Sequence, residues 1–242
     1  MTGELLISIV IPTYQHAATL PMCLDALFSQ TYKNIQVIVV NDGSTDGTDS
    51  VVQPYLDRIV YIVQENAGSN PARNRGWEEA TGAYIIFCDA DVRMKPDMLQ
   101  KLVDALEKNP EASYAYSASK FGWKTFGAVA FSDERLRTRN FIHTSALIRA
   151  DDFPGFDNAI KRLQDWDVWL TMLASGKRGV LVTELLFEVE VDGDSRIGSS
   201  WMPSFVYKVP WGMIGWAPPQ VRKYEDARRI IMKKHGLNSS PF

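Results

Sequence analysis

Runs of apolar residues rich in valine and isoleucine alternate, along the first half of the chain, with segments of helical periodicity. Four such runs are predicted strands: LISIVIP (6–12), IQVIVVND (35–42), RIVYIVQ (58–64) and AYIIFC (83–88). The predicted helices between them cover 18–30, 45–54 and about 70–80. Strands that are apolar throughout are buried on both faces, and helical crossovers join parallel strands. The pattern therefore predicts a Rossmann-like α/β fold, with a mostly parallel sheet and helices on both faces.

The second half of the chain is less regular. Pro96 opens a predicted helix that ends near Asn109, and another helix is predicted over 165–175. The remaining predicted strands lie in ASYAYSA (112–118), HTSALIRA (143–150), GVLVTE (179–184) and LFEVEV (186–191). Polar, aromatic and basic residues mix between 120 and 140, so this stretch is expected to be a loop or an irregular insert over the sheet edge.

The C-terminal tail combines aromatic and basic residues. Residues 199–219 hold three tryptophans interrupted by four prolines, a pattern that excludes a membrane-spanning helix. Residues 220–235 are predicted to form an amphipathic helix with an excess of basic side chains. Its apolar stripe consists of Val221, Tyr224, Ala227 and Ile231. Two interpretations stay open: residues 199–235 bind an anionic membrane peripherally, or the tail packs on the rest of the molecule with its basic face in water.

Composition narrows the class of protein. The 242 residues are 45% apolar, so one core can cover most of the chain. The formal net charge is −3, so no nucleic acid is expected as a partner. Cys23 and Cys88 lie in apolar runs without the spacing of a zinc site, which indicates buried thiols in a reducing compartment. The N-terminal apolar run is too short for a signal peptide. We therefore expect a cytoplasmic protein, with at most peripheral contact at the inner face of a membrane.

The segment FCDADV (87–92) places two carboxylates, Asp89 and Asp91, directly after a buried strand. Ligands of open α/β sheets bind at the carboxyl ends of the strands. Ionised carboxylates this close repel each other, and a divalent cation that also binds diphosphate oxygens would relieve that repulsion. The alternative is a turn in which one aspartate caps a neighbouring helix. The strand context favours a site for Mn2+ or Mg2+.

A second strand end lies in VVNDGSTDGT (39–48), which leads through a turn into a capped helix. Asp42 could accept hydrogen bonds from the base or ribose of a nucleotide, while the helix start faces negative charge. Alternatively, Asp42 belongs only to the turn, and Thr45 or Asp46 is the N-cap. The first strand ends at PTYQH (12–16) on the same edge of a parallel sheet, so three strand ends converge on one crevice.

Four segments resemble, in this order, the family-2 glycosyltransferases of the GT-A fold, over about 6–196. They are SIVIPTYQHAATLPMCLDALFSQTY, IQVIVVNDGSTDGT, QENAGSNPARNRGWEEATGAYIIFCDAD and FDNAIKRLQDWDVWLTMLASG. The resemblance implies an inverting enzyme that moves a sugar from a nucleotide-diphosphate sugar to an acceptor hydroxyl with the help of Mn2+ or Mg2+. It also implies a GT-A domain over 1–198, with a nucleotide-sugar half of about 1–95 and an acceptor half of about 96–198. A C-terminal arm and helix would then cover 199–242.

The same resemblance assigns roles to individual residues. The implied donor-binding positions are Pro12, Thr13, Tyr14, Asp42, Gly68, Arg73, Asn74, Asp89 and Ala90. Metal contact is expected mainly through Asp91, together with Asp89. Many relatives have a histidine after the strand at 186–191, and here Asp192 could replace it as an oxygen ligand or be an ordinary turn aspartate.

The family's catalytic base is the aspartate of a Glu-Asp pair that opens a helix, and it corresponds here to Asp165, with Gln164 in place of glutamate. An inverting transfer needs one carboxylate within reach of the acceptor hydroxyl. Asp165 would also serve as a helix N-cap, and both roles can hold together. On the acceptor side, Trp166 is the best-placed tryptophan to stack on a sugar, and His143 precedes a strand that enters this side.

Two other functions fit parts of the pattern. A nucleotide-sugar-binding module that has lost catalysis would explain the missing glutamate and histidine. Four aspartates speak against it because they are intact: Asp42, Asp89, Asp91 and Asp165. A sugar-phosphate nucleotidyltransferase shares the acidic metal ligands, but that class has a glycine-rich loop after the first strand where this chain has PTYQH. The expected partners are a nucleotide-diphosphate sugar and a glycan or lipid-linked acceptor.

Overall fold

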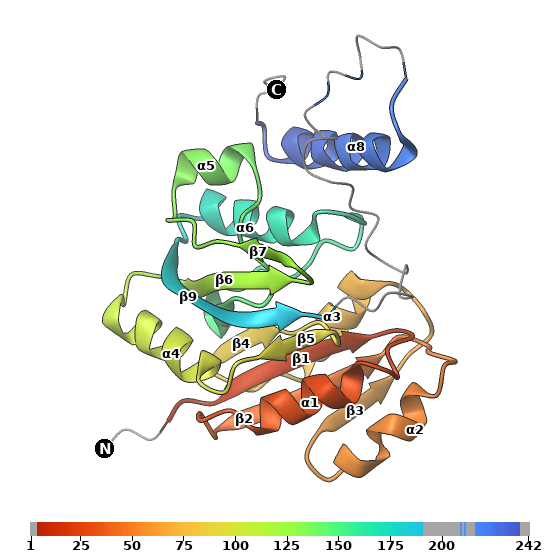
Figure 1. The fold of residues 1–242 in the computed structure, drawn as a ribbon. Coiled ribbons are helices and arrows are strands. Elements are labelled where there is room, and N and C mark those ends of the chain that lie inside the picture. Colours follow the sequence, from red (N-terminus) through yellow and green to blue (C-terminus); the bar gives the residue numbers. More distant parts are fainter. Residues whose placement is uncertain (1–3, 191–208, 210, 212–215, 238–242) are drawn as a thin grey trace.

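The computed structural model describes residues 4–190, 209, 211 and 216–237, whose arrangement is shown in Figure 1. A nine-stranded sheet has the order β3-β2-β1-β4-β8-β6-β9-β5, with β7 paired to β6. The strands are β1 (Ile7–Thr13), β2 (Ile35–Asn41), β3 (Val60–Val63), β4 (Tyr84–Phe87), β5 (Val92–Met94), β6 (Tyr114–Phe121), β7 (Lys124–Phe126), β8 (Leu147–Arg149) and β9 (Gly179–Val189). The helices are α1 (Leu20–Phe28), α2 (Thr48–Val52), α3 (Ser69–Glu78), α4 (Met98–Lys108), α5 (Asp133–Thr138), α6 (Gln164–Ala174) and α8 (Pro219–Lys234).

The strands that come first in the chain form the parallel part of the sheet. β3, β2, β1 and β4 are neighbours in that order, and all three pairings between them are parallel. β1 and β4 are buried along their whole length, as expected for strands covered by helices on both faces. β8 then pairs antiparallel with both β4 and β6, while β6 and β9 are parallel. The predicted α/β fold with helices on both faces is confirmed.

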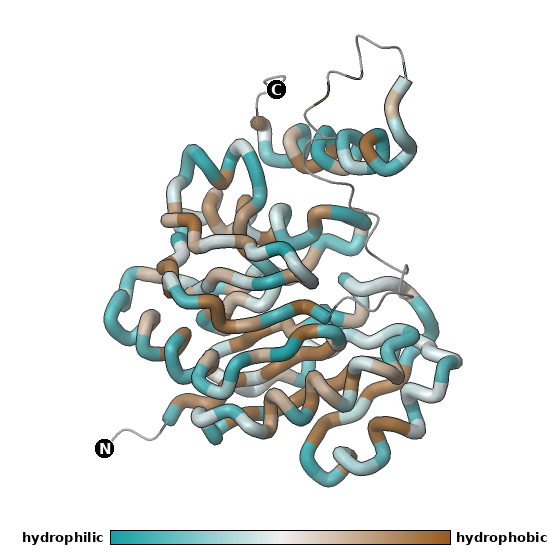
Figure 2. Tube along the Cα trace, viewed as in Figure 1, coloured by the Kyte–Doolittle hydropathy of each residue, from teal (hydrophilic) through white to brown (hydrophobic). Residues whose placement is uncertain are grey.

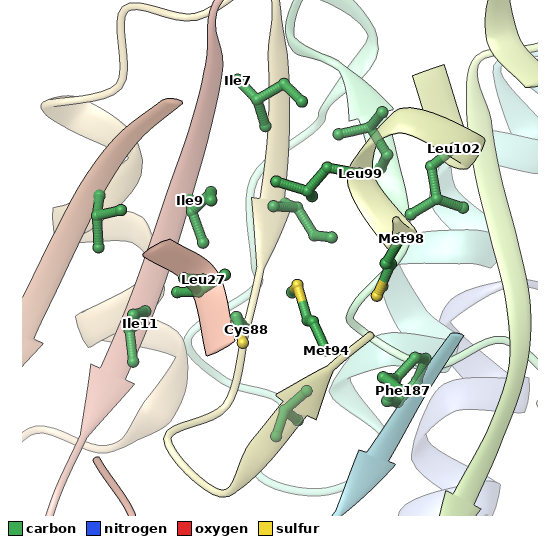
Figure 3. Packing of buried hydrophobic residues seen from close by; sticks show 14 of the residues in the cluster. Ile7, Ile9, Ile11, Leu27, Cys88, Met94, Met98, Leu99, Leu102 and Phe187 are labelled. Atoms are coloured by element: carbon green, nitrogen blue, oxygen red, sulfur yellow. The ribbon is translucent and has the colours of Figure 1, made fainter. Parts of the chain in front are cut away.

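Each face of the sheet has its own core because successive strand residues point to opposite sides. Three residues of β1 face the cluster shared with α1 and α4: Ile7, Ile9 and Ile11. Figure 3 shows them packed with Leu27 and Leu99. The thiols of Cys23 and Cys88 lie 3.6 Å apart in the same cluster, so the prediction of buried cysteines is confirmed. Val10 points the other way, into a cluster built with α3, α6 and α8.

The expectation of an irregular stretch over 120–140 is wrong in part. β6 continues to Phe121 and turns at Gly122 into β7, and α5 follows. β7 is exposed along its length and α5 buries only Leu136, so neither element needs the apolar periodicity by which buried elements are found. A local signal does exist for α5, because the Ser132 side chain accepts a hydrogen bond from the Arg135 N–H as an N-cap.

The two strands predicted over 179–184 and 186–191 are one strand, β9. The apolar pattern breaks at Thr183 and Glu184, which are exposed, and the pairing with β6 shifts register between Ser117 and Ser119. A register shift lets a strand bend while it continues to pair. The polar break therefore marks an irregularity within one strand.

The C-terminal helix α8 packs on the same side of the sheet as α6 (Figure 1). Apolar and polar residues alternate along it in Figure 2. Val221, Ala227 and Ile231 of the predicted stripe are buried and Tyr224 is partly buried, as expected for an amphipathic helix on a core. Among the described residues, no helix is long and apolar enough to cross a membrane.

Candidate active site

The ends of β1 and β2 lie side by side because the two strands pair in parallel, with Thr13 opposite Asn41. Their following loops are tied together by Gln15: its backbone N–H donates to Ser44 Oγ at 3.0 Å, and its Oε1 accepts from the Thr45 N–H at 2.8 Å. Gln15 has a φ of 58°, a left-handed conformation that is uncommon for a residue with a side chain. Such conformations collect at binding sites, where the surrounding contacts hold them.

The residues at the end of β1 differ in their exposure and in their chemical groups. Pro12 and Thr13 are buried within the strand, and Thr13 Oγ1 has no hydrogen-bond partner among the described residues. Tyr14 is 41% exposed. A buried hydroxyl without a partner is uncommon in proteins. Beside the loops after β1 and β2, the structure thus has one buried hydroxyl without a partner and one exposed aromatic ring.

Asp42 follows β2 and pins the chain that leads into α3. One carboxylate oxygen accepts from Gln64 Nε2 at 2.7 Å and from the Ala67 N–H at 2.9 Å, and the other accepts from the Gly68 N–H at 2.8 Å. Gly68 precedes α3 with a φ of 97°, which glycine adopts without strain. A Cβ at this position would meet no described atom within 4 Å. The N-terminus of α3 is therefore fixed by Asp42 and has open space in front of it.

Arg73 of α3 makes a partly buried ion pair with the first aspartate after β4. Its Nη2 donates to Asp89 Oδ1 at 2.7 Å, and its guanidinium lies 5.2 Å from the centre of the Phe156 ring. Burial on its own would raise the pKa of Asp89, but Arg73, with His143 and His16, outweighs it and lowers that pKa. Arg73 Nε is buried and has no partner among the described residues.

The second aspartate, Asp91, holds its proton more tightly. Burial and the charge of Asp89 raise the pKa of Asp91 to about 7. Ala90 between the two is completely buried. Within the described residues, no three histidine, cysteine, aspartate or glutamate side chains are grouped as a metal site. Two carboxylates that compete for one proton nevertheless fit a hard divalent cation whose other ligands come from a diphosphate.

Asp165 lies in the first turn of α6. Its Oδ1 accepts from the Trp166 N–H at 2.9 Å, and its Oδ2 accepts from Asn140 Nδ2 at 2.6 Å. Burial raises the pKa of Asp165, against the opposing effects of His143, Arg73 and these hydrogen bonds. Leu163, directly before the helix, has a φ of 57°. The carboxylate is thus held in one orientation, and its affinity for a proton is increased.

His143 connects the two acidic parts of the site. Its Nδ1 accepts a hydrogen bond from the Ser145 N–H at 3.1 Å, so the neutral ring carries its proton on Nε2. Burial lowers the pKa of His143, while Asp89 and Asp165 act in the opposite direction. Asp89 and Asp165 therefore both lie close enough to the His143 ring to affect its pKa.

For three predicted site residues, the structure does not support the predicted role or does not describe the residue. Trp166 is 1% exposed and its Nε1 donates to the Leu136 carbonyl at 2.6 Å, so its assignment as a sugar-stacking residue is wrong: the ring belongs to the core. The side-chain amide of Asn74 holds the backbone N–H and carbonyl of Phe156, which leaves a donor contact by Asn74 without support. Asp192 lies outside the described residues.

Two residues of the site have no signal in the sequence. Asn140 reaches Asp165 from the stretch that lacks any periodicity. Asn70 on α3 donates to the backbone carbonyls of Asp157 and Ile160, at 2.9 and 3.0 Å, and so joins the start of α3 to the loop before α6. Both act through contacts between segments distant in the chain, which composition and local spacing do not reveal.

The family described as "Glycosyl transferase family 2" matches residues 8–160. An uncharacterized glycosyltransferase of Rickettsia prowazekii is 30% identical over 95% of this chain and 72% of its own length. The putative teichuronic acid biosynthesis glycosyltransferase TuaG of Bacillus subtilis is 26% identical over 90% of this chain and 97% of its own length. The glycosyltransferase GlyA of Streptococcus pneumoniae is 41% identical, but the match spans only 40% of this chain and 14% of that protein.

Solved structures share the fold. S. aureus TarS in complex with UDP-GlcNAc superposes with a TM-score of 0.67 at 19% identity, over 84% of this chain and 63% of that one. A mannosyltransferase from Pyrobaculum calidifontis in complex with GDP-Man and Mn2+ gives a TM-score of 0.65 at 19% identity, over 95% of this chain and 70% of that one. The fold is the GT-A fold expected from the sequence. The chain therefore belongs to glycosyl transferase family 2.

Proposed function

We propose that this chain transfers a sugar from a nucleoside-diphosphate sugar to an acceptor hydroxyl, with inversion at the anomeric carbon. The observation that carries the proposal is Asp165, a partly buried carboxylate with a raised pKa that, like Asp89, affects the pKa of His143. A general base works best when its pKa lies near the working pH, and burial moves Asp165 in that direction.

The donor would occupy the crevice between the loops after β1, β2 and β4. The exposed Tyr14 ring suits the nucleoside, and the N-terminus of α3, with open space at Gly68, suits the diphosphate. Arg73, fixed by Asp89, would add positive charge at the same place. The structural neighbours were solved with UDP-GlcNAc and with GDP-Man, which are both donors of this chemical class.

A divalent cation, Mn2+ or Mg2+, would be held by Asp91 and Asp89 together with diphosphate oxygens. The two carboxylates fit this ion because, without it, the pKa of Asp91 rises to about 7. When bound, the cation would neutralise negative charge that develops on the leaving diphosphate. The mannosyltransferase neighbour was solved with Mn2+.

The reaction would be a single displacement. Asp165 takes the proton of the acceptor hydroxyl, and the acceptor oxygen forms a bond to the anomeric carbon from the face opposite the diphosphate. The bond from the anomeric carbon to the diphosphate oxygen breaks, and its electron pair leaves with the nucleoside diphosphate. Asn140 keeps the carboxylate of Asp165 aimed by holding Oδ2. The role of His143 is to line the space between Asp89 and Asp165 with an Nε2–H donor.

We further propose that the acceptor is lipid-linked and that α8 docks on an anionic lipid surface. The outward face of α8 exposes Arg222, Lys223, Arg229 and Lys233 against Glu225 and Asp226, a local excess of positive charge. Ile230 on this face is 57% exposed, and Trp216 just before the helix is 58% exposed. Tryptophan favours the headgroup region of a bilayer, and basic side chains are attracted to anionic lipids.

A donor screen tests the proposed function. Purified protein is mixed with nucleoside-diphosphate sugars in the presence of Mn2+, and its thermal unfolding is recorded, since a ligand that binds the native state raises the unfolding temperature. We expect one nucleotide class to stabilise the protein in a metal-dependent manner and to release free nucleoside diphosphate once an acceptor is added. Stabilisation without any transfer would favour a binding module, and pyrophosphate release would favour a nucleotidyltransferase.

A further inference from the structure

The last turn of α8 makes a set of charged contacts with the segment that carries Asp165. Lys234 Nζ lies 2.8 Å from Asp167 Oδ2 and 2.8 Å from Asp157 Oδ2. His235 Nε2 lies 2.8 Å from Asp167 Oδ1. The Asp167 side chain is 4% exposed, so both of its oxygens are bound to α8 and shielded from water. We call these four residues, Asp157, Asp167, Lys234 and His235, the α8 clamp.

The clamp contacts α6 close to the proposed base. Asp167 is two residues after Asp165 in the first turn of α6, and its backbone N–H donates to the Leu163 carbonyl at 3.1 Å. Leu163 has the left-handed backbone described above, and a strained residue persists only when its surroundings hold it. A contact that fixes Asp167 therefore also fixes the turn in which Asp165 is presented.

The clamp also reaches the donor side. The backbone carbonyl of Asp157 accepts the 2.9 Å hydrogen bond from Asn70, and Asn70 Oδ1 lies 3.4 Å from Arg73 Nη1. Arg73 in turn holds Asp89. Lys234 thus joins the first turn of α6 to the loop that supports the start of α3, the two places where acceptor and donor chemistry meet.

We infer that α8 positions the catalytic base: Lys234 and His235 are positioning residues that hold the first turn of α6, and with it Asp165, in the reactive orientation. The inference rests on the proposed function because it takes Asp165 as the base. A buried ion pair adds little stability compared with apolar packing, but it fixes one geometry and leaves a costly unpaired charge when one partner is removed. Displacing a reacting group by about 1 Å can lower the rate on the order of 10²-fold.

Substitution of Lys234 tests this inference. Lys234→Met keeps the length of the side chain and removes both ion pairs. Lys108→Met is the matched control, since Lys108 also lies in the last turn of a helix, is exposed and makes no ion pair among the described residues. We expect Lys234→Met to lower kcat by about 10- to 100-fold with donor KM nearly unchanged, and Lys234→Arg to recover most of the loss. Amide hydrogen exchange in the first turn of α6 should become faster in Lys234→Met and stay unchanged in Lys108→Met.

A double variant separates positioning from stability. In Lys234→Met, only His235 remains paired with the buried carboxylate of Asp167, and this loss lowers the stability of the protein. When Lys234→Met is combined with Asp167→Asn, no buried carboxylate remains unpaired at this place. We expect the double variant to fold and to keep a low kcat. Wild-type kcat in either variant, with unchanged exchange in α6, would overturn the inference while leaving the proposed function intact. If the wild-type protein transfers no sugar, the proposed function fails, and hydrogen exchange still decides whether α8 holds the first turn of α6.

Discussion

Three aspartates within one small region differ in their affinity for a proton because their neighbours differ. Arg73 donates to Asp89 and outweighs the effect of burial on its pKa. Asp91 is partly buried beside the charge of Asp89. Asp165 is partly buried and accepts hydrogen bonds from one side-chain amide and one backbone N–H. At this scale the site contains one carboxylate whose pKa is lowered, Asp89, and two whose pKa is raised, Asp91 to about 7 and Asp165 by burial.

Asp165→Asn tests the base at the level of one residue. The amide keeps the shape of the side chain but cannot take a proton, so kcat should fall by roughly 10²–10⁴-fold while donor affinity barely changes. Steady-state kinetics and direct donor titration measure the two quantities separately. Because Asp165 acts only when ionised and its pKa is raised, wild-type activity should be lost on acidification at a higher pH than for an ordinary carboxylate. Loss of donor binding with retained kcat would assign Asp165 to the donor site instead.

The metal proposal predicts a pH dependence of ion binding. Asp91 has a pKa of about 7 without metal, so below that pH a cation must displace its proton. Calorimetric titration of Mn2+ in the presence of nucleoside diphosphate should show affinity falling by about tenfold per pH unit below about pH 7. Asp91→Ala should abolish metal-dependent donor binding and leave the fold intact. Transfer by Asp91→Ala at the wild-type rate with the metal chelated would show that the metal assignment is wrong.

At the scale of helices and strands, the sequence predicted the buried elements well and the exposed ones poorly. β1, β2 and β4 were predicted within two residues of their bounds because they are continuous apolar runs covered on both faces. β7 and α5 are not predicted from the sequence because almost none of their residues is buried. The same limit explains the site: strand-end aspartates follow from the parallel sheet, but Asn140 and the α8 clamp depend on tertiary contacts. Trp166 was misassigned because its burial is likewise set by the tertiary fold.

Gly76 illustrates how packing constrains an element near the site. It lies on α3, three residues after Arg73, and a Cβ there would lie 2.4 Å from Val10 Cγ1 and 3.1 Å from Val40 Cγ2. Gly76→Ala should therefore lower the free energy of unfolding by about 1–3 kcal/mol, as overpacking does. Gly127→Ala is the control, since no described atom lies within 4 Å of its Cβ, and it should change stability by less than about 0.5 kcal/mol. Equal urea midpoints for Gly76→Ala and the wild type would show that α3 is not packed this closely on the sheet.

At the scale of the whole molecule, α8 has two faces with separate roles. Its inner face buries Ile231 and Met232 in the core shared with α6, and its last turn carries the clamp. Its outer face carries the exposed basic side chains and Ile230. The packing interpretation of the tail thus holds for this helix, and it leaves the basic face directed away from the core. Residues 191–208, which connect β9 to this region, lie outside the part of the chain that the structure describes.

Liposome flotation tests whether the outer face binds lipid. The wild-type protein should co-float with anionic liposomes at low salt and be released at high salt, since ions screen exposed charges over about 10 Å at 0.1 M. Replacing Arg222, Lys223 and Lys233 by glutamine should remove the binding and leave transfer to a soluble acceptor unchanged. Wild-type protein that never co-floats, or a variant that floats equally well, would end the lipid proposal and point to a soluble acceptor.

The central claim is single displacement with Asp165 as the base, and the anomeric configuration of the product tests it most directly. Wild-type protein is supplied with its donor, Mn2+ and an acceptor, and the new glycosidic bond is examined by NMR. We predict that the configuration is inverted relative to the donor, because the acceptor oxygen attacks opposite the departing diphosphate, and that Asp165→Asn forms almost none of this product. A product with retained configuration would contradict a single displacement and remove Asp165 from the role assigned to it.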